Sequence, residues 1–152
     1  MSLIGKSFMK KLLNKRCLLD TNVLVSFIDK KHQYHKKASE IFEQILAGNI
    51  ETFISSQNIL ELTAVFIHGY KKPKREVAEN IELLMSDKLI ALIYPSTKSL
   101  IRFLELMKKN TEIHTVDLFL ISTALENDID IIISGDKNLQ KIKEIAVFNP
   151  FS

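Results

Sequence analysis

Short apolar runs alternate with amphipathic segments along almost the whole chain, and this alternation constrains the fold more than any single motif. The run 130–133 predicts a buried strand, whereas Ala38, Ile41 and Ile45 are spaced to bury one face of a helix. Strands are predicted near residues 16–20, 51–54, 89–94, 130–133 and 145–148. Helices are predicted over residues 22–29, 34–47, 55–67, 73–85, 96–108 and 115–126, with a short one from residue 137. This order is typical of an α/β fold, and we predict a single-domain three-layer sandwich with a mainly parallel central sheet.

The predicted helix ends carry residues that suit them. Ser55, Ser96 and Thr115 stand at predicted N-caps, where a side-chain oxygen accepts a hydrogen bond from a free amide of the first turn. Pro73 begins one helix and Gly48 ends another, as is usual for these two residues.

Length and composition favour one domain. The 152 residues, of which 46% are hydrophobic, are enough for a substantial core. No apolar run reaches the roughly 18 residues that span a bilayer, and the lysine-rich N-terminus lacks the apolar core of a secretory signal. We therefore expect a soluble, cytoplasmic protein. Residues 1–8 are interpreted as a possible added leader, and residues 9–152 as the domain. Cys17 is the only cysteine, so we expect a buried thiol within a strand.

Four acidic residues are the candidate functional side chains. Asp20 and Asp136 follow predicted strands, while Glu61 and Asp117 lie on predicted helices. The carboxyl ends of parallel strands meet at one edge of a sheet, so these acids can converge on one crevice and bind a divalent metal ion. Taken singly, Asp20 or Asp117 could equally be a helix cap. For Asp117, the positive end of its helix would also favour the ionised carboxylate.

The basic residues point to an anionic substrate. Net charge is only +3, from 21 Lys and Arg against 18 Asp and Glu. The basic residues nevertheless cluster at 10–16, at 30–31 with 36–37, and at 71–75. Because a nuclease needs anionic metal ligands and cationic flanks for the substrate backbone, the combination favours nucleic acid over a small metabolite.

At these residues the chain resembles the PIN-domain nucleases. The matching segments are residues 18–24, 55–62, 115–124 and 133–139, in the same order and spacing. The most specific parts are Asp20-Thr21-Asn22 and Asp136-Lys137-Asn138. Asn138 departs from the pattern, because some members of the family carry a further acid there.

The resemblance implies a metal-dependent endoribonuclease, similar to the VapC-like toxins that a small antitoxin protein holds inactive. It assigns Asp20, Glu61, Asp117 and Asp136 as ligands of one or two Mg²⁺ or Mn²⁺ ions. Thr21, Asn22, Ser134 and Asn138 are then expected to position these acids or a water molecule. The implied substrate is single-stranded or structured RNA, cut by activated water.

Two alternatives remain open at this point. A catalytically silent PIN-like interaction module would keep the fold without the activity. A haloacid-dehalogenase-like phosphatase also begins with an aspartate after a strand, but its general acid would stand where this chain has Asn22.

The helices at 57–67 and 74–85 carry more apolar positions than one buried stripe requires, among them Phe66, Ile67 and Met85. We therefore expect a homodimer, and an antitoxin tail bound beside the active site.

Overall fold

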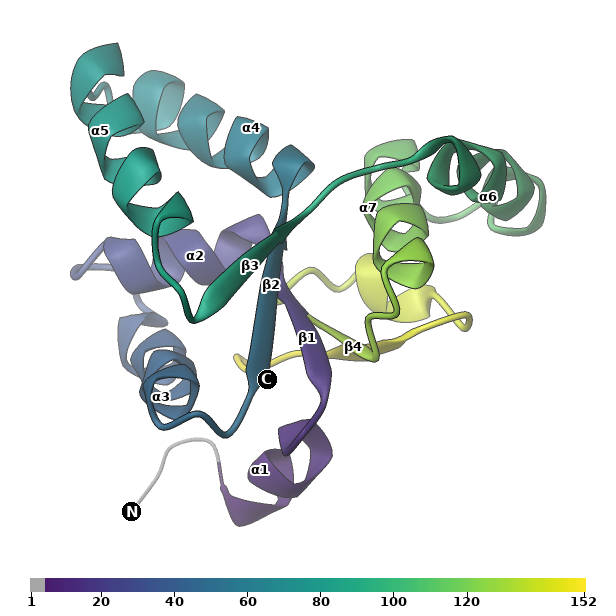
Figure 1. Ribbon diagram of the computed structural model, residues 1–152, viewed down its shortest axis with the longest axis horizontal. Coiled ribbons are helices and arrows are strands. Elements are labelled where there is room, and N and C mark those ends of the chain that lie inside the picture. Colours follow the sequence, from purple (N-terminus) through teal and green to yellow (C-terminus); the bar gives the residue numbers. More distant parts are fainter. Residues whose placement is uncertain (1–4) are drawn as a thin grey trace.

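A single parallel sheet organises the molecule. The computed structural model describes residues 5–152, and of residues 8 and 9 only the backbone. The strand order is β3-β2-β1-β4-β5, and all pairings between neighbouring strands are parallel. The strands are β1 (Arg16–Leu19), β2 (Glu51–Ser55), β3 (Ile90–Ile93), β4 (Ile131–Ile133) and β5 (Ala146–Phe148). The predicted α/β fold is thus confirmed (Figure 1).

Helices cover both faces of this sheet (Figure 1). One layer comprises α2 (Thr21–Ile28), α3 (His35–Leu46), α4 (Ser56–Ala64) and α5 (Lys74–Met85). The other comprises α6 (Thr97–Lys109) and α7 (Thr115–Glu126), with the short 3₁₀ helix η2 (Leu139–Lys141). No helix among the described residues is long and apolar enough to cross a membrane.

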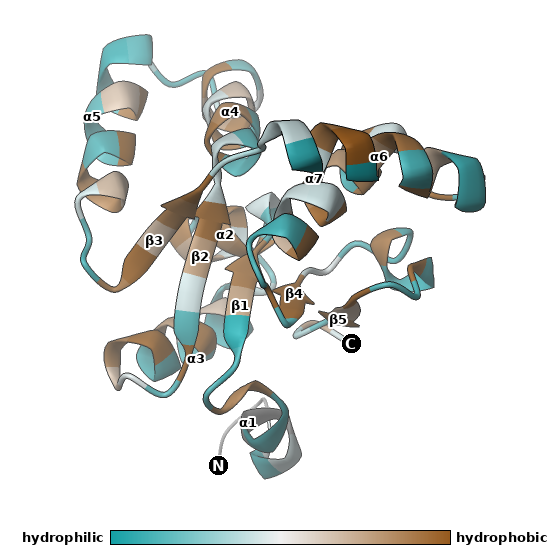
Figure 2. Cartoon of the chain, turned by 45° about the vertical axis from the view of Figure 1, so that its right-hand side comes forward, coloured by the Kyte–Doolittle hydropathy of each residue, from teal (hydrophilic) through white to brown (hydrophobic). Residues whose placement is uncertain are grey.

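Successive side chains of each strand pack alternately into two hydrophobic cores, one on each face of the sheet. Because both faces are buried, each strand is a continuous apolar run in the sequence. In β1, Cys17 and Leu19 pack toward α2–α5, whereas Leu18 packs toward α6 and α7. Ile133 and Ile132 divide in the same way in β4. Figure 2 shows these hydrophobic strands between the helices. Cys17 is fully buried, and burial raises the pKa of its thiol to about 12, as expected for a core residue.

Several predicted boundaries need correction. The helix predicted to Ile67 is regular only to Ala64, and the chain continues as a π-helical turn, η1 (Val65–Gly69). Ser55 and Ser96 are N-caps, each in a reciprocal pair with the residue three positions later. Thr115 is not a cap, because His114 occupies that position and its side chain makes no capping bond.

The N-terminal helix α1 (Lys6–Leu12) was not predicted. It crosses the predicted leader boundary at residue 8, and Leu12 packs in the core. Residues 1–4 lie outside the described part of the chain, so the leader at 1–8 stays a prediction.

The sheet order places a crevice beside β1. The chain runs from β1 outward through β2 to β3, and then returns to place β4 and β5 on the other side of β1. Connections after β1 and β4 therefore leave the sheet in different directions, which opens a crevice at their carboxyl ends. Asp20 follows β1 directly, and Asp136 lies three residues after β4.

Candidate active site

Asp20 lies at the centre of the crevice. It is only 6% exposed, and its backbone N–H donates to the carbonyl of Ile133, which extends the pairing of β1 with β4. Its Oδ1 accepts a 2.8 Å hydrogen bond from the N–H of Thr21, so the residue also caps α2. The cap and candidate-ligand interpretations are therefore compatible for this residue.

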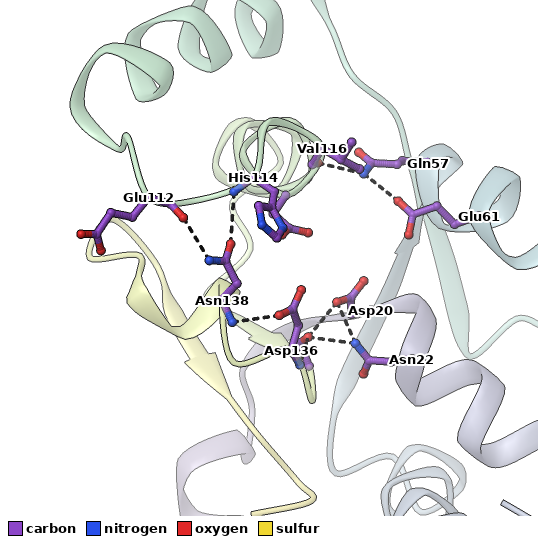
Figure 3. Close-up of polar contacts among 11 residues, drawn as sticks. Asp20, Asn22, Gln57, Glu61, Glu112, His114, Val116, Asp136 and Asn138 are labelled. Carbon is purple, nitrogen blue, oxygen red and sulfur yellow. Dashed lines mark hydrogen bonds and ion pairs between the residues drawn. The ribbon is translucent and has the colours of Figure 1, made fainter. Parts of the chain in front are cut away.

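Ser134 and Asn22 fix the other oxygen of Asp20. The Ser134 hydroxyl donates to Asp20 Oδ2 at 2.7 Å, and Asn22 Nδ2 donates to the same oxygen at 3.1 Å (Figure 3). Asn22 Oδ1 in turn accepts from the N–H of Gly135 at 2.9 Å. The loops after β1 and β4 are thus joined through polar side chains rather than through backbone pairing.

Asp136 lies in the turn that follows Ser134. Its N–H donates to Ser134 Oγ at 3.0 Å, and its Oδ1 accepts from the N–H of Asn138 at 2.8 Å. Asn138 therefore supports Asp136 through its backbone. Its side chain faces the other way, where Oδ1 accepts from the N–H of His114 and Nδ2 donates to the carbonyl of Glu112 (Figure 3). These bonds tie the start of α7 to the Asp136 turn.

Glu61 reaches the crevice from α4. Thr21 Oγ1 donates to Glu61 Oε2 at 3.1 Å, and Gln57 Nε2 donates to Glu61 Oε1 at 2.7 Å. Gln57 Nε2 also donates to the carbonyl of Val116 at 2.9 Å, so α4 and the first turn of α7 are joined beside the carboxylate (Figure 3).

Asp117 lies in the first turn of α7, and its side chain is 17% exposed. Its Oδ2 is 3.7 Å from Nδ1 of His114. Burial and the neighbouring Asp136 and Asp20 raise the pKa of Asp117 to about 6. The favourable effect expected from the helix N-terminus is outweighed, although at neutral pH the carboxyl is still mostly ionised.

The electrostatics of Asp20 follow the same pattern. Burial raises its pKa, the hydrogen bonds from Ser134 and Thr21 oppose that rise, and Glu61 and Asp136 add to it. The carboxylates thus disfavour one another's ionised form.

All four predicted acids line one cavity of about 570 Å³, together with Thr21 and Asn22. In Figure 3, Asp20, Asp136 and Glu61 point toward a common space. Within the described part of the chain, no three His, Cys, Asp or Glu side chains are grouped closely enough to hold one ion as they stand. The donors nevertheless fit Mg²⁺ or Mn²⁺ by their chemistry, since Mg²⁺ is commonly held by one or two carboxylates and retains several water molecules. The raised pKa values also indicate negative charge that a cation would offset.

Two residues of α4 that contact the acids or their partners were not predicted as site residues. Asn58 is fully buried, and its Nδ2 donates to Thr21 Oγ1 at 3.2 Å and to Asp20 Oδ1 at 3.5 Å. Its Oδ1 accepts from the Ser55 hydroxyl at 2.8 Å. Gln57, described above, is the other. The usable signal was their spacing, one turn before Glu61 on the same helix.

The fold and this site define an α/β protein with an acidic cavity at the point where the strand order reverses. The PIN domain family model matches residues 17–145, and the chain belongs to this family. A curated VapC ribonuclease of Aquifex aeolicus (strain VF5) is 29% identical over 72 residues, which are 47% of this chain. The match covers 53% of that relative, so the chain spans about half the length of the curated protein that it matches.

Solved structures share the fold at low sequence identity. VapC20 of Mycobacterium tuberculosis, described as a sarcin-ricin loop cleaving toxin, superposes with a TM-score of 0.67 at 11% identity, covering 82% of this chain and 93% of that one. VapBC2 of Rickettsia felis, bound to a DNA fragment from its promoter, superposes with a TM-score of 0.66 at 22% identity, and the match covers 87% of this chain and 96% of that one. VapBC-1 of nontypeable Haemophilus influenzae superposes with a TM-score of 0.67 at 20% identity, and the match covers 90% of this chain and 99% of that one.

Proposed function

We propose that this chain is a metal-dependent endoribonuclease and the toxin of a toxin-antitoxin pair. The observation that carries the proposal is the convergence of Asp20, Glu61, Asp117 and Asp136 on one cavity. Membership of the PIN family and similarity to a VapC ribonuclease give the reaction class. The silent-module alternative is disfavoured because all four acids are present, three of them held by hydrogen bonds and Asp117 lying 3.7 Å from His114.

The four acids are the proposed ligands of one or two Mg²⁺ or Mn²⁺ ions. Such an ion lowers the pKa of its bound water and offsets charge on the phosphate and the leaving oxygen. The chain's own contribution is to hold the carboxylates in place. Ser134 and Asn22 fix Asp20, and Thr21 fixes Glu61, so that few side-chain rotations are left to be lost when substrate binds.

The activity test uses single-stranded RNA and the full chain. Cleavage is expected with Mg²⁺ or Mn²⁺, loss of cleavage with EDTA, and loss in an Asp20→Asn variant that retains the wild-type circular dichroism spectrum. A phosphatase would instead hydrolyse p-nitrophenyl phosphate, and a silent module would act on neither substrate. Intact RNA after prolonged incubation of the wild type with both metals would contradict the proposal.

The proposed antitoxin site is an apolar groove of about 810 Å³ between α2, η1 and α5. Its lining is mainly apolar, with Phe27, Phe66 and Leu84 among it, and its charged residues are the three lysines Lys30, Lys31 and Lys72 and the two acids Asp29 and Glu76. Apolar residues beside cations suit one face of an amphipathic, acidic tail. Solved VapBC complexes of the same fold support a toxin-antitoxin pairing. Co-expression with the small reading frame next to this gene should give a stable complex that no longer cuts RNA, and a Phe66→Glu variant should escape inhibition.

We also propose a homodimer. The helices on which the prediction rested present Leu60 at 71% exposure, Leu83 at 69% and Met85 at 47%. Phe66 and Ile67 do not belong to this surplus, because both are half-buried against the core. Light scattering at micromolar concentration should give twice the chain mass, and a monomer mass would contradict the proposal.

A further inference from the structure

Aromatic side chains line the same cavity as the four acids. Tyr34, which precedes α3, and Phe151, near the C-terminus, are stacked with ring centroids 4.5 Å apart and an interplanar angle of 7°. The ring of His32 lies 5.8 Å from that of Tyr34, tilted by 43°. Tyr34, Phe151 and His32 line this cavity together with Glu61 and the other three acids. None of the three was a predicted site residue.

The position of Phe151 is fixed by the turn that carries Asp136. A Cβ atom on Gly135 would lie 2.6 Å from Cδ2 of Phe151, so the ring packs directly on this glycine. The N–H of Phe151 donates to Asn149 Oδ1, and Lys37 Nζ donates to its carbonyl at 3.4 Å. The Tyr34 ring therefore stands at a defined place relative to Gly135 and Asp136.

We propose that Tyr34 and Phe151 form a platform on which a nucleobase of single-stranded RNA stacks, next to the phosphodiester held at the acids. This inference rests on the proposed nuclease function, which it deepens by naming a base-binding subsite. Any base offers a π-face, so aromatic side chains beside a reaction site bind single strands with little dependence on sequence. Duplex RNA keeps its bases stacked inside the helix and is not bound in this way.

Charge around the platform fits the same ligand. Lys37, in the first turn of α3, lies beside the platform, because its Nζ donates to the carbonyl of Phe151 at 3.4 Å. The acids alone would repel a phosphodiester, whereas a cation at this place can bind a phosphate next to a stacked base.

The chain contains no tryptophan, which permits a direct test. A Tyr34→Trp variant carries one tryptophan in the platform, and its fluorescence should fall at least about twofold when a short single-stranded oligonucleotide is added in EDTA. Stacking of a base on indole is the physical cause. Tyr94→Trp is the matched control, because Tyr94 is 61% exposed and does not line the cavity. Quenching confined to Tyr34→Trp supports the platform, and quenching absent at oligonucleotide concentrations that saturate wild-type binding overturns it.

Loss of the ring gives a second readout. Tyr34→Leu should raise KM for single-stranded RNA about tenfold with little change in kcat, while Tyr34→Phe should stay within about twofold of wild type. Tyr94→Leu should leave both constants unchanged, and melting curves verify that each variant is folded. Wild-type cleavage with an unaltered KM in Tyr34→Leu refutes the platform. If the wild type instead cuts no RNA, the proposed function fails, whereas selective quenching of Tyr34→Trp would still support a base-binding site.

Discussion

Ser134 Oγ donates a 2.7 Å hydrogen bond to Asp20 Oδ2, across 114 positions of the sequence. The same hydroxyl oxygen accepts from the N–H of Asp136 at 3.0 Å. One buried serine thus joins the carboxylate of Asp20 to the backbone of Asp136, at the point where the strand order of the sheet reverses. The geometry of the site therefore depends on a side chain that is itself not a candidate ligand.

Replacing Ser134 by alanine should lower RNA cleavage about tenfold or more, as is usual when a residue that orients a metal ligand is removed. The buried carboxylate of Asp20 loses its shortest hydrogen bond, which also costs about 1–3 kcal/mol in the free energy of unfolding. Ser134→Thr keeps the hydroxyl and should restore most of the activity. Steady-state cleavage and urea unfolding of the three proteins decide the matter. Equal activity in all three would contradict this role.

Asp117→Asn should abolish cleavage and yet raise the melting temperature in metal-free buffer. In the folded protein the pKa of Asp117 is raised from 3.8 to about 6, so the folded state binds protons more tightly than the unfolded state does. Its contribution to stability therefore falls as pH rises from about 4 to about 6. Asparagine carries no charge, so the variant should lose less stability over this interval. Thermal unfolding between pH 4 and pH 7 in EDTA measures the difference.

If Asp117 acted only at the helix start, Asp117→Asn would behave differently. His114 is the N-cap of α7, so Asp117 in the first turn would then act only through its charge, and the asparagine variant would melt at or below the wild-type temperature with cleavage intact. Glu126→Gln at the other end of α7 is the control for loss of charge on this helix, because its partner Arg102 lies outside the cavity.

Mg²⁺ or Mn²⁺ should stabilise the wild-type chain. When the free ion concentration is about a hundred times the dissociation constant, one bound ion adds about 2.7 kcal/mol to the free energy of unfolding. Asp117→Asn should gain much less, because a ligand is missing and less repulsion remains to be relieved. Sodium chloride at matched ionic strength controls for screening. The same shift with sodium as with magnesium would show that no specific site is filled.

Much of this architecture could be predicted from local pattern. The apolar runs predicted the five strands, and the acids placed just after two of these runs predicted the crevice. Helical spacing placed Asn58 and Gln57 beside Glu61, but it could not reveal their partners Asp20 and Val116, which depend on how α4 packs against β1 and α7. Contacts between distant elements leave no periodic signal. The stack of Tyr34 on Phe151 was missed for the same reason.

Asn58→Ala should lower both stability and activity. Its amide caps α4 with Ser55 and supports Asp20 and Thr21, so alanine leaves several buried groups without partners. A loss of about 1–3 kcal/mol is expected. Ser99→Ala offers a matched control, because Ser99 is equally buried and forms the same reciprocal cap, with Ser96, at the start of α6. That variant should lose stability but cleave RNA normally. Similar cleavage by the two variants would show that Asn58 is only a helix cap.

Gly135→Ala should disturb the aromatic platform without touching an acid. The new methyl group would lie 2.6 Å from Cδ2 of Phe151, so the ring must shift and its stacking on Tyr34 must loosen. Such overpacking typically costs about 1–3 kcal/mol. Gly69→Ala is the control, since nothing lies within 4 Å of a Cβ there, and alanine in place of a helical glycine should be neutral or slightly stabilising. The free energy of unfolding in urea and the affinity for RNA in EDTA should both fall for Gly135→Ala, and neither should fall for Gly69→Ala. If the two alanine variants bind RNA and unfold alike, Phe151 does not pack on this turn in solution, and the platform loses its anchor.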